Sequence, residues 1–86
     1  MYRISFRSSF IRQYNNLEEA LQDEILEKVE LLKDRSNHKK LKVHKLQGHL
    51  AKYWSFSINY KIRIVFYFES REEIVLSLLG DHDIYK

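Results

Sequence analysis

The apolar residues of this chain recur at a helical period in its first half and at a strand period in its second half. Between residues 17 and 34 they fall three or four positions apart, which predicts one amphipathic helix with the stripe Leu17, Leu21, Ile25, Val29 and Leu32. From residue 54 onward they alternate with polar residues or form short apolar runs, which predicts strands over 54–58, 62–68 and 73–79. This switch of period favours a fold in which helices cover a sheet.

Two shorter elements precede the long helix. Residues 3–7 alternate between apolar and polar side chains and predict a strand, after which Ser8 or Ser9 can cap a short helix. Asn16 and Glu19 resemble a capping box at the start of the long helix. We therefore predict an α+β fold in the order β-α-α-β-β-β, with two helices from the amino-terminal half packed on one face of a four-stranded, mainly antiparallel sheet.

The length and the composition narrow the setting. With 86 residues the chain can build one hydrophobic core but not two, so we expect a single domain over residues 1–86. It contains no cysteine, which excludes disulfides and thiolate metal sites. No apolar stretch approaches the length of a membrane span and no signal-peptide core follows Met1, so we expect a cytoplasmic protein.

The charges separate along the chain. Residues 17–34 carry seven acidic side chains and two lysines, whereas residues 35–52 carry no acid, six lysines or arginines and three histidines. Such separation is typical of a protein with a basic side that meets a polyanion. On charge alone, a solvated loop explains the basic segment equally well.

Arg63 interrupts an apolar strand. If Ile62 and Ile64 face the helices, Arg63 faces the open side of the sheet. An arginine there needs water or an anionic partner, and Glu73 on the next strand is one candidate within the chain.

Side chains that can exchange protons flank the same strands. His44 precedes the first strand of the second half, and His82 and Tyr85 follow the last one after Gly80. Because consecutive antiparallel strands are neighbours, these side chains should meet Arg63 at one end or across one face of the sheet. Two histidines, an arginine and a tyrosine suit phosphodiester chemistry, although a packing role remains open for each.

The remaining histidines give no sign of a metal site. His38 and His49 are expected to lie in solvent, and their spacing from His44 matches no zinc-ligand pattern. We therefore expect neither a metal nor another cofactor.

Several segments in register resemble the RelE/ParE superfamily of type II toxins. The matching segments are 44–48, 53–55, 58–59, 62–66 and 80–85. The amino-terminal strand and the two helices also fit the family's order, so the resemblance covers essentially the whole chain. It is closest to the YoeB-like and YafQ-like RelE branch, whose members are ribosome-dependent messenger RNA endonucleases, and it implies a RelE-like fold of the microbial ribonuclease type.

The resemblance implies a role for each candidate residue. His44 would be the general base, Arg63 would contact the scissile phosphate, His82 would be the general acid, and Tyr85 would stack on or orient the nucleotide. The ribose 2′-hydroxyl would attack the phosphorus without a metal ion. Possible helpers in RNA binding are Lys45, Lys52 and Lys61. Ser57 departs from the family, because many relatives carry a lysine, arginine or histidine there.

The resemblance also implies partners. A cognate antitoxin would cover the basic face, and messenger RNA on the ribosome would be the substrate, with neither a membrane nor a small-molecule cofactor involved. Two other functions stay open. One is a ParE-like toxin that inhibits DNA gyrase, and the other is a non-catalytic member that only binds its antitoxin, for which Ser57 is the argument.

Overall fold

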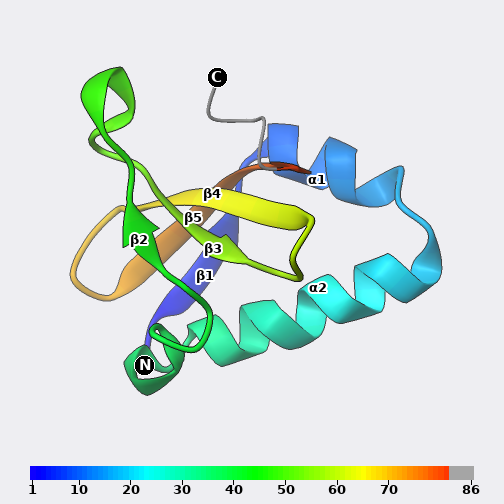
Figure 1. Ribbon diagram of the computed structural model, residues 1–86, viewed down its shortest axis with the longest axis horizontal. Coiled ribbons are helices and arrows are strands. Elements are labelled where there is room, and N and C mark those ends of the chain that lie inside the picture. The colour runs from blue at the N-terminus through cyan, green and yellow to red at the C-terminus, as the bar shows by residue number, and fades with distance from the viewer. Residues whose placement is uncertain (82–86) are drawn as a thin grey trace.

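The chain folds into a five-stranded sheet with two helices on one face (Figure 1). The computed structural model describes residues 1–81. The strands are β1 (Arg3–Phe6), β2 (His44–Lys45), β3 (Trp54–Ser57), β4 (Ile62–Phe68) and β5 (Glu73–Asp81). The helices are α1 (Ser8–Asn15) and α2 (Glu19–Leu32), and the short 3-10 helices are η1 (Arg35–Asn37) and η2 (Gly48–Leu50).

The sheet has the strand order β1-β5-β4-β3-β2. β1 runs parallel to β5, and every other neighbouring pair is antiparallel. The predicted α+β class, the two helices and the antiparallel meander are thus confirmed. The predicted number of four strands is wrong, because His44 and Lys45 pair with the free edge of β3 and add a fifth strand.

One face of the sheet builds the core with the two helices. Alternate residues of β3, β4 and β5 point toward α2, as the strand period requires. The large side chains with no more than 2% of their surface exposed are Phe10, Ile25, Leu32, Phe56, Ile64, Phe66, Ile74 and Leu76. This packing makes one face of the sheet structural. The opposite face is partly covered as well, since Ser55, Val65, Val75 and Ser77 on it are buried.

The helix starts differ from the prediction. Arg7 is the N-cap of α1 and Glu18 that of α2, and neither helix has a side-chain cap. Asn16 ends α1 instead of starting α2, so the predicted capping box is wrong. The hydroxyl of Ser9 donates to the carbonyl of Ser77 in β5 (2.7 Å) and so fastens α1 to the sheet.

Gln13 makes a second link between α1 and β5. Its side-chain amide donates to the carbonyl of Leu79 (2.6 Å) and accepts from the backbone N–H of the same residue (2.8 Å). β5 continues to Asp81, two residues beyond the predicted end of the strand. The helix therefore supports the carboxy-terminal part of β5, which lies beside Arg63 of β4.

The long helix stops near the predicted position. α2 ends at Leu32, and the side chain of Asp34 then accepts from the backbone N–H of Ser36 (3.0 Å) at the start of η1. The hydrogen bonds from Ser36 hold the pKa of Asp34 below its ordinary value. Within residues 1–81, neither helix has the length and apolar character needed to cross a membrane.

Candidate anion-binding site

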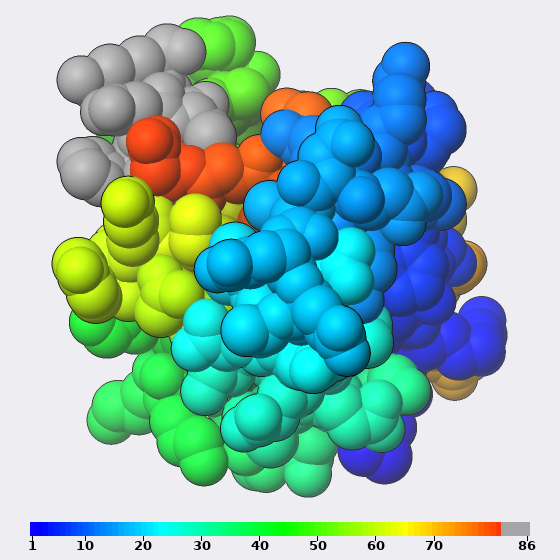
Figure 2. All heavy atoms as spheres, turned by 90° about the vertical axis from the view of Figure 1, so that its right-hand side faces the viewer, coloured from blue at the N-terminus to red at the C-terminus, as the bar shows by residue number. Residues whose placement is uncertain are grey.

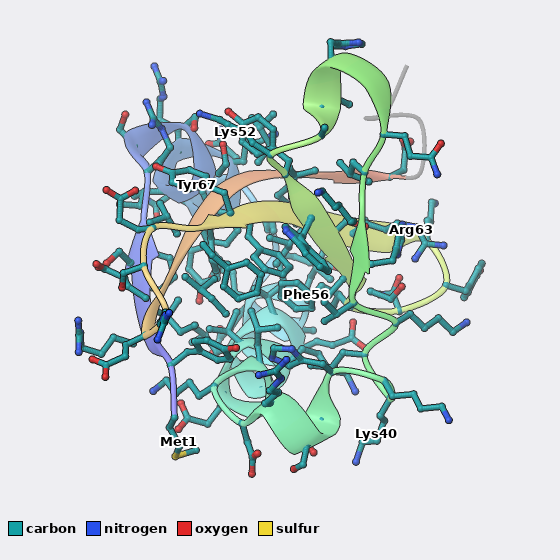
Figure 3. The ribbon with its side chains drawn as sticks, turned by 90° about the vertical axis from the view of Figure 1, so that its left-hand side faces the viewer. Met1, Lys40, Lys52, Phe56, Arg63 and Tyr67 are labelled. Carbon is teal, nitrogen blue, oxygen red and sulfur yellow. The ribbon has the colours of Figure 1, made fainter. Side chains whose placement is uncertain are left out.

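Arg63 lies on the sheet face opposite the helices (Figure 3). Its neighbours Ile62 and Ile64 both pack into the core, so the orientation predicted from strand parity is confirmed. The guanidinium donates a hydrogen bond to the hydroxyl of Ser57, directly across from it on β3. Glu73 is not its partner, since that carboxylate accepts a hydrogen bond from a serine of β1 at the far end of β5.

Arg63 lines a basic hollow of about 320 Å³. Within residues 1–81, four cations and no carboxylate line this hollow; its lining residues are Lys28, Lys40, Leu41, Lys42, Ser57, Ile58, Asn59, Tyr60 and Arg63. Clustered lysines raise the local positive potential beyond that of one arginine. The basic hollow therefore favours an anionic ligand.

Buried Leu41 positions two of these lysines. Its side chain is 3% exposed in the core, and its carbonyl accepts from the backbone N–H of Ser57 (2.9 Å). Lys40 and Lys42, on either side of it, are consequently directed outward beside the end of β3. Lys42 has φ +58°, the left-handed backbone conformation that non-glycine residues adopt at a cost of about 1 kcal/mol.

Asn59 forms the boundary between the basic hollow and an acidic one. Its side-chain oxygen accepts from the backbone N–H groups of Lys61 (2.9 Å) and Ile62 (2.8 Å), which shapes the turn between β3 and β4. Its amide donates to the carboxylate of Glu24 (2.9 Å). The neighbouring hollow, of about 580 Å³, is lined by acidic residues of the α2 region, namely Glu18, Asp23, Glu24 and Glu27. An anion is therefore favoured on one side of Asn59 and disfavoured on the other.

His44 lies on the same sheet face as Arg63 but on a different strand. It pairs with Ser55 and Arg63 pairs with Ser57, two residues further along β3. The Nδ1 atom of His44 is 2.9 Å from the carbonyl of Lys42, so we assign the proton to Nδ1. Nε2 then carries the lone pair and lies 3.3 Å from the hydroxyl of Ser55. In this tautomer Nε2 is the ring atom that can accept a proton.

The structure places neither His82 nor Tyr85, because both lie outside the described residues. It does place the strand that leads to them. Gly80 of β5 pairs with Arg63, and Asp81 pairs with Ile62. The chain therefore reaches the level of Arg63 at the last residues that the structure describes.

The three lysines predicted to bind RNA do not line the basic hollow. Lys45 is exposed on β2 and Lys61 is exposed in the turn before β4. The ammonium of Lys52 lies 5.2 Å from the ring centroid of Tyr53 and 5.3 Å from that of Tyr67. In Figure 3, Lys52 and Tyr67 lie on one side of the molecule and Arg63 lies on the other.

Sequence reasoning missed Lys28, Lys40 and Lys42. The charge separation pointed to the basic segment that contains Lys40 and Lys42, but no local pattern distinguished them from its other lysines. Lys28 stands among the acids of α2 and gave no signal at all.

The other histidines have different environments. His49 is exposed, as predicted. The prediction that His38 lies in solvent is wrong: its ring stacks on Tyr2 at 5.5 Å between centroids, and its Nε2 lies 2.9 Å from the carbonyl of Leu32. Among residues 1–81, no three side chains of the types that bind metal gather closely enough to hold an ion.

Comparison with known proteins identifies the fold. No family model and no curated protein matches the chain. A chain of the heterotetrameric YoeB–YefM toxin–antitoxin complex from Staphylococcus aureus is 20% identical with a TM-score of 0.74, over 95% of this chain and 98% of that one. A chain of the archaeal RelE–RelB complex from Pyrococcus horikoshii OT3 is 18% identical with a TM-score of 0.73, over 93% of each chain. YafQ from E. coli is 11% identical with a TM-score of 0.67, over 98% and 97%. These likenesses confirm the RelE-type fold that the sequence resemblance predicts, with YoeB and YafQ among the similar structures.

Proposed function

We propose that this chain is a toxin of the RelE/ParE superfamily that cleaves messenger RNA on the ribosome without a metal ion. The observation that carries this proposal is the position of Arg63, on the face of a RelE-type sheet opposite the helices and in a hollow that, in the described part of the chain, is lined by four cations and no carboxylate. A phosphodiester is the anion that fits such a site in a protein of this fold.

The proposed reaction uses groups on or near this face. His44 removes the proton from a ribose 2′-hydroxyl, whose oxygen attacks the adjacent phosphorus and forms a 2′,3′-cyclic phosphate. His82 gives a proton to the departing 5′-oxygen, and Tyr85 orients the nucleotide. Arg63 stabilises the charge that builds on the non-bridging oxygens. DNA lacks the 2′-hydroxyl and cannot react in this way.

The lysines of the basic hollow hold the phosphates on either side of the scissile one. Lys28, Lys40 and Lys42 surround the space next to Arg63, where the backbone of a single strand would continue. Lys45, Lys52 and Lys61 remain candidates for contacts further along the RNA. Because phosphate contacts release counterions, binding should weaken steeply with added salt.

Ser57 supports this function instead of weakening it. Its hydroxyl accepts a hydrogen bond from Arg63 and thereby orients the guanidinium. A cation at position 57 would lie directly across from Arg63 and repel it. In this chain Lys40 and Lys42 supply the positive charge that relatives place on the strand.

A cognate antitoxin is the proposed protein partner, in the cytoplasm where ribosomes are found. The similar RelE and YoeB chains were solved in complexes with RelB and YefM. The basic hollow offers the antitoxin a surface that its acidic residues can contact. The helical side of the molecule, shown in Figure 2, offers an apolar groove. Phe6, Ile11 and Leu26 line that groove and are 42–50% exposed.

Primer extension after induced expression tests the proposed function. We expect new 5′ ends within messages that are being translated, and at least about 10²-fold fewer with the His82→Ala variant, since that variant lacks the acid. DNA-damage signalling without such ends would indicate a gyrase inhibitor. Expression that does no harm would indicate a protein that only binds its antitoxin.

The Lys42→Gly variant separates binding from stability. Glycine accepts φ +58° without strain, so the free energy of unfolding should stay equal or rise by up to about 1 kcal/mol in urea titrations. The affinity for an oligoribonucleotide should fall, and the slope of log K against log salt should flatten by about 0.7 for one lost phosphate contact. Lys33→Ala is the control, because Lys33 pairs with Glu30 (2.9 Å) outside the basic hollow. Equal effects of the two variants would exclude a specific contact by Lys42.

A further inference from the structure

Another hollow, of about 630 Å³, is lined by aromatic rings and arginines. We call it the aromatic hollow; the residues that matter here are Tyr2, Arg35, His38, Trp54, Phe68 and Arg71. It borders the same segment as the basic hollow, since His38 and Val43 line the aromatic hollow and residues 40–42 between them line the basic hollow. Among the residues that the structure describes, no carboxylate lines the aromatic hollow.

The rings of the aromatic hollow are held in place by their mutual contacts. Trp54 meets Phe68 edge to face with 5.4 Å between centroids, and Tyr2 lies 5.5 Å from Phe68. Tyr2 also stacks on His38 with an angle of 14° between the rings. The hydrogen bond of His38 to the carbonyl of Leu32 fixes that ring in turn. These half-buried rings form a preformed surface on which a planar group can stack without reorganisation.

The two arginines are available to an anion. Arg35 lies in η1 and Arg71 in the connection between β4 and β5, and both are exposed. Across residues 1–81 the ion pairs are Arg3–Glu72 and Lys33–Glu30, so neither arginine is in one. The acids beside them in sequence have other partners, because Glu72 pairs with Arg3 (3.4 Å) and Asp34 accepts from Ser36. Both acids line an adjoining hollow that Arg35 and Arg71 also border, but neither acid lines the aromatic hollow.

We propose that the aromatic hollow binds a nucleotide. The base stacks on the rings beside Trp54, and Arg35 and Arg71 hold the phosphate. Aromatic faces stack with any base, and the planar guanidinium matches phosphate oxygens, so this combination suits a nucleotide better than a bare anion or an apolar group. The volume is sufficient for one nucleotide with its phosphate. This inference does not depend on the cleavage reaction, since neither His44 nor Arg63 lines this hollow.

Trp54 provides a direct readout, because it is the only tryptophan in the chain. The full-length protein is titrated with AMP, adenosine, inorganic phosphate and a short oligoribonucleotide. Fluorescence is excited at the red edge of tryptophan absorption, where adenine does not absorb. We expect saturable quenching by AMP and by the oligoribonucleotide, and at least about tenfold weaker binding of adenosine and of phosphate. If the oligoribonucleotide binds more tightly than AMP, the natural ligand of the aromatic hollow is a nucleotide within an RNA chain. If the two bind equally, the natural ligand is a free nucleotide.

Substitution of the arginines tests the geometry. The double variant Arg35→Ala/Arg71→Ala should bind AMP at least about tenfold more weakly, and circular dichroism should show an unchanged fold because both side chains are exposed. Arg12→Ala, at an exposed arginine of α1 outside this hollow, should bind AMP like the unaltered protein. The proposal is overturned if AMP does not quench Trp54, if the double variant binds AMP as tightly as Arg12→Ala does, or if phosphate alone binds as well as AMP. A protein that cleaves no message but shows the expected quenching would contradict the proposed function and leave this site standing.

Discussion

Replacement of Arg63 by alanine is expected to slow messenger RNA cleavage by about 10²–10³-fold, because one donor to the developing negative charge is removed from a preorganised site. Arg63 is the cation that lies on the sheet face opposite the helices, lines the basic hollow and is oriented by its hydrogen bond to Ser57. The measurement is the single-turnover cleavage rate of messenger RNA on programmed ribosomes. The free energy of unfolding should change by less than about 1 kcal/mol. Arg63 is only half-buried, and in the variant water can reach the Ser57 hydroxyl that has lost its arginine donor.

Two further variants refine this test. Arg63→Lys keeps the charge but loses the planar pair of donors, so its rate should fall between those of alanine and arginine. Ser57→Ala leaves the guanidinium in place but without its hydrogen-bond acceptor on β3, so its effect should be the smallest of the three. Cleavage by Arg63→Ala within a few-fold of the unaltered protein would show that the scissile phosphate lies elsewhere.

The elements with long, regular patterns could be predicted from the sequence, and short ones could not. α2 and the strands β3 to β5 repeat their apolar side chains often enough to reveal a period, and the structure contains all of them. β2 has only two residues, so alternation cannot be recognised in it, and its pairing depends on the edge of β3. Asn16 shows a different limit. The same residue type favours the end of one helix and the start of the next, and here the backbone N–H of Asn16 bonds to Gln13 and closes α1.

The candidate site divides in a similar way. The orientation of Arg63 follows from a rule that holds within one strand, so the sequence was sufficient to predict it. The basic hollow needs α2, the segment around Leu41 and the end of β3 to meet. That meeting is set by the burial of Leu41 and its bond to Ser57, which no local pattern encodes. Only its charge favours Lys52 as an RNA-binding residue. In the structure its ammonium lies over two tyrosine rings, away from Arg63.

The sheet face that carries Arg63 also depends on the core behind it, and Phe56 is the residue that links them. Phe56 is fully buried, meets Phe66 edge to face at 5.8 Å, and lies on β3 between Ser55 and Ser57, which contact His44 and Arg63. Phe56→Ala should lower the free energy of unfolding by about 3–5 kcal/mol, through lost burial and the cavity that remains.

A loss of that size is a large part of the roughly 5–15 kcal/mol that stabilises a typical domain. The variant should therefore lose the proposed RNA binding and cleavage under mild heating, although Phe56 points away from the sheet face that carries Arg63. Urea unfolding followed by circular dichroism measures the change. Tyr60→Ala is the control for stability, because Tyr60 is 91% exposed and its replacement should shift the unfolding free energy by no more than about 0.5 kcal/mol. Equal unfolding midpoints for the two variants would mean that this core does not hold β3 in place. The core would then not explain why Ser55 and Ser57 lie beside His44 and Arg63.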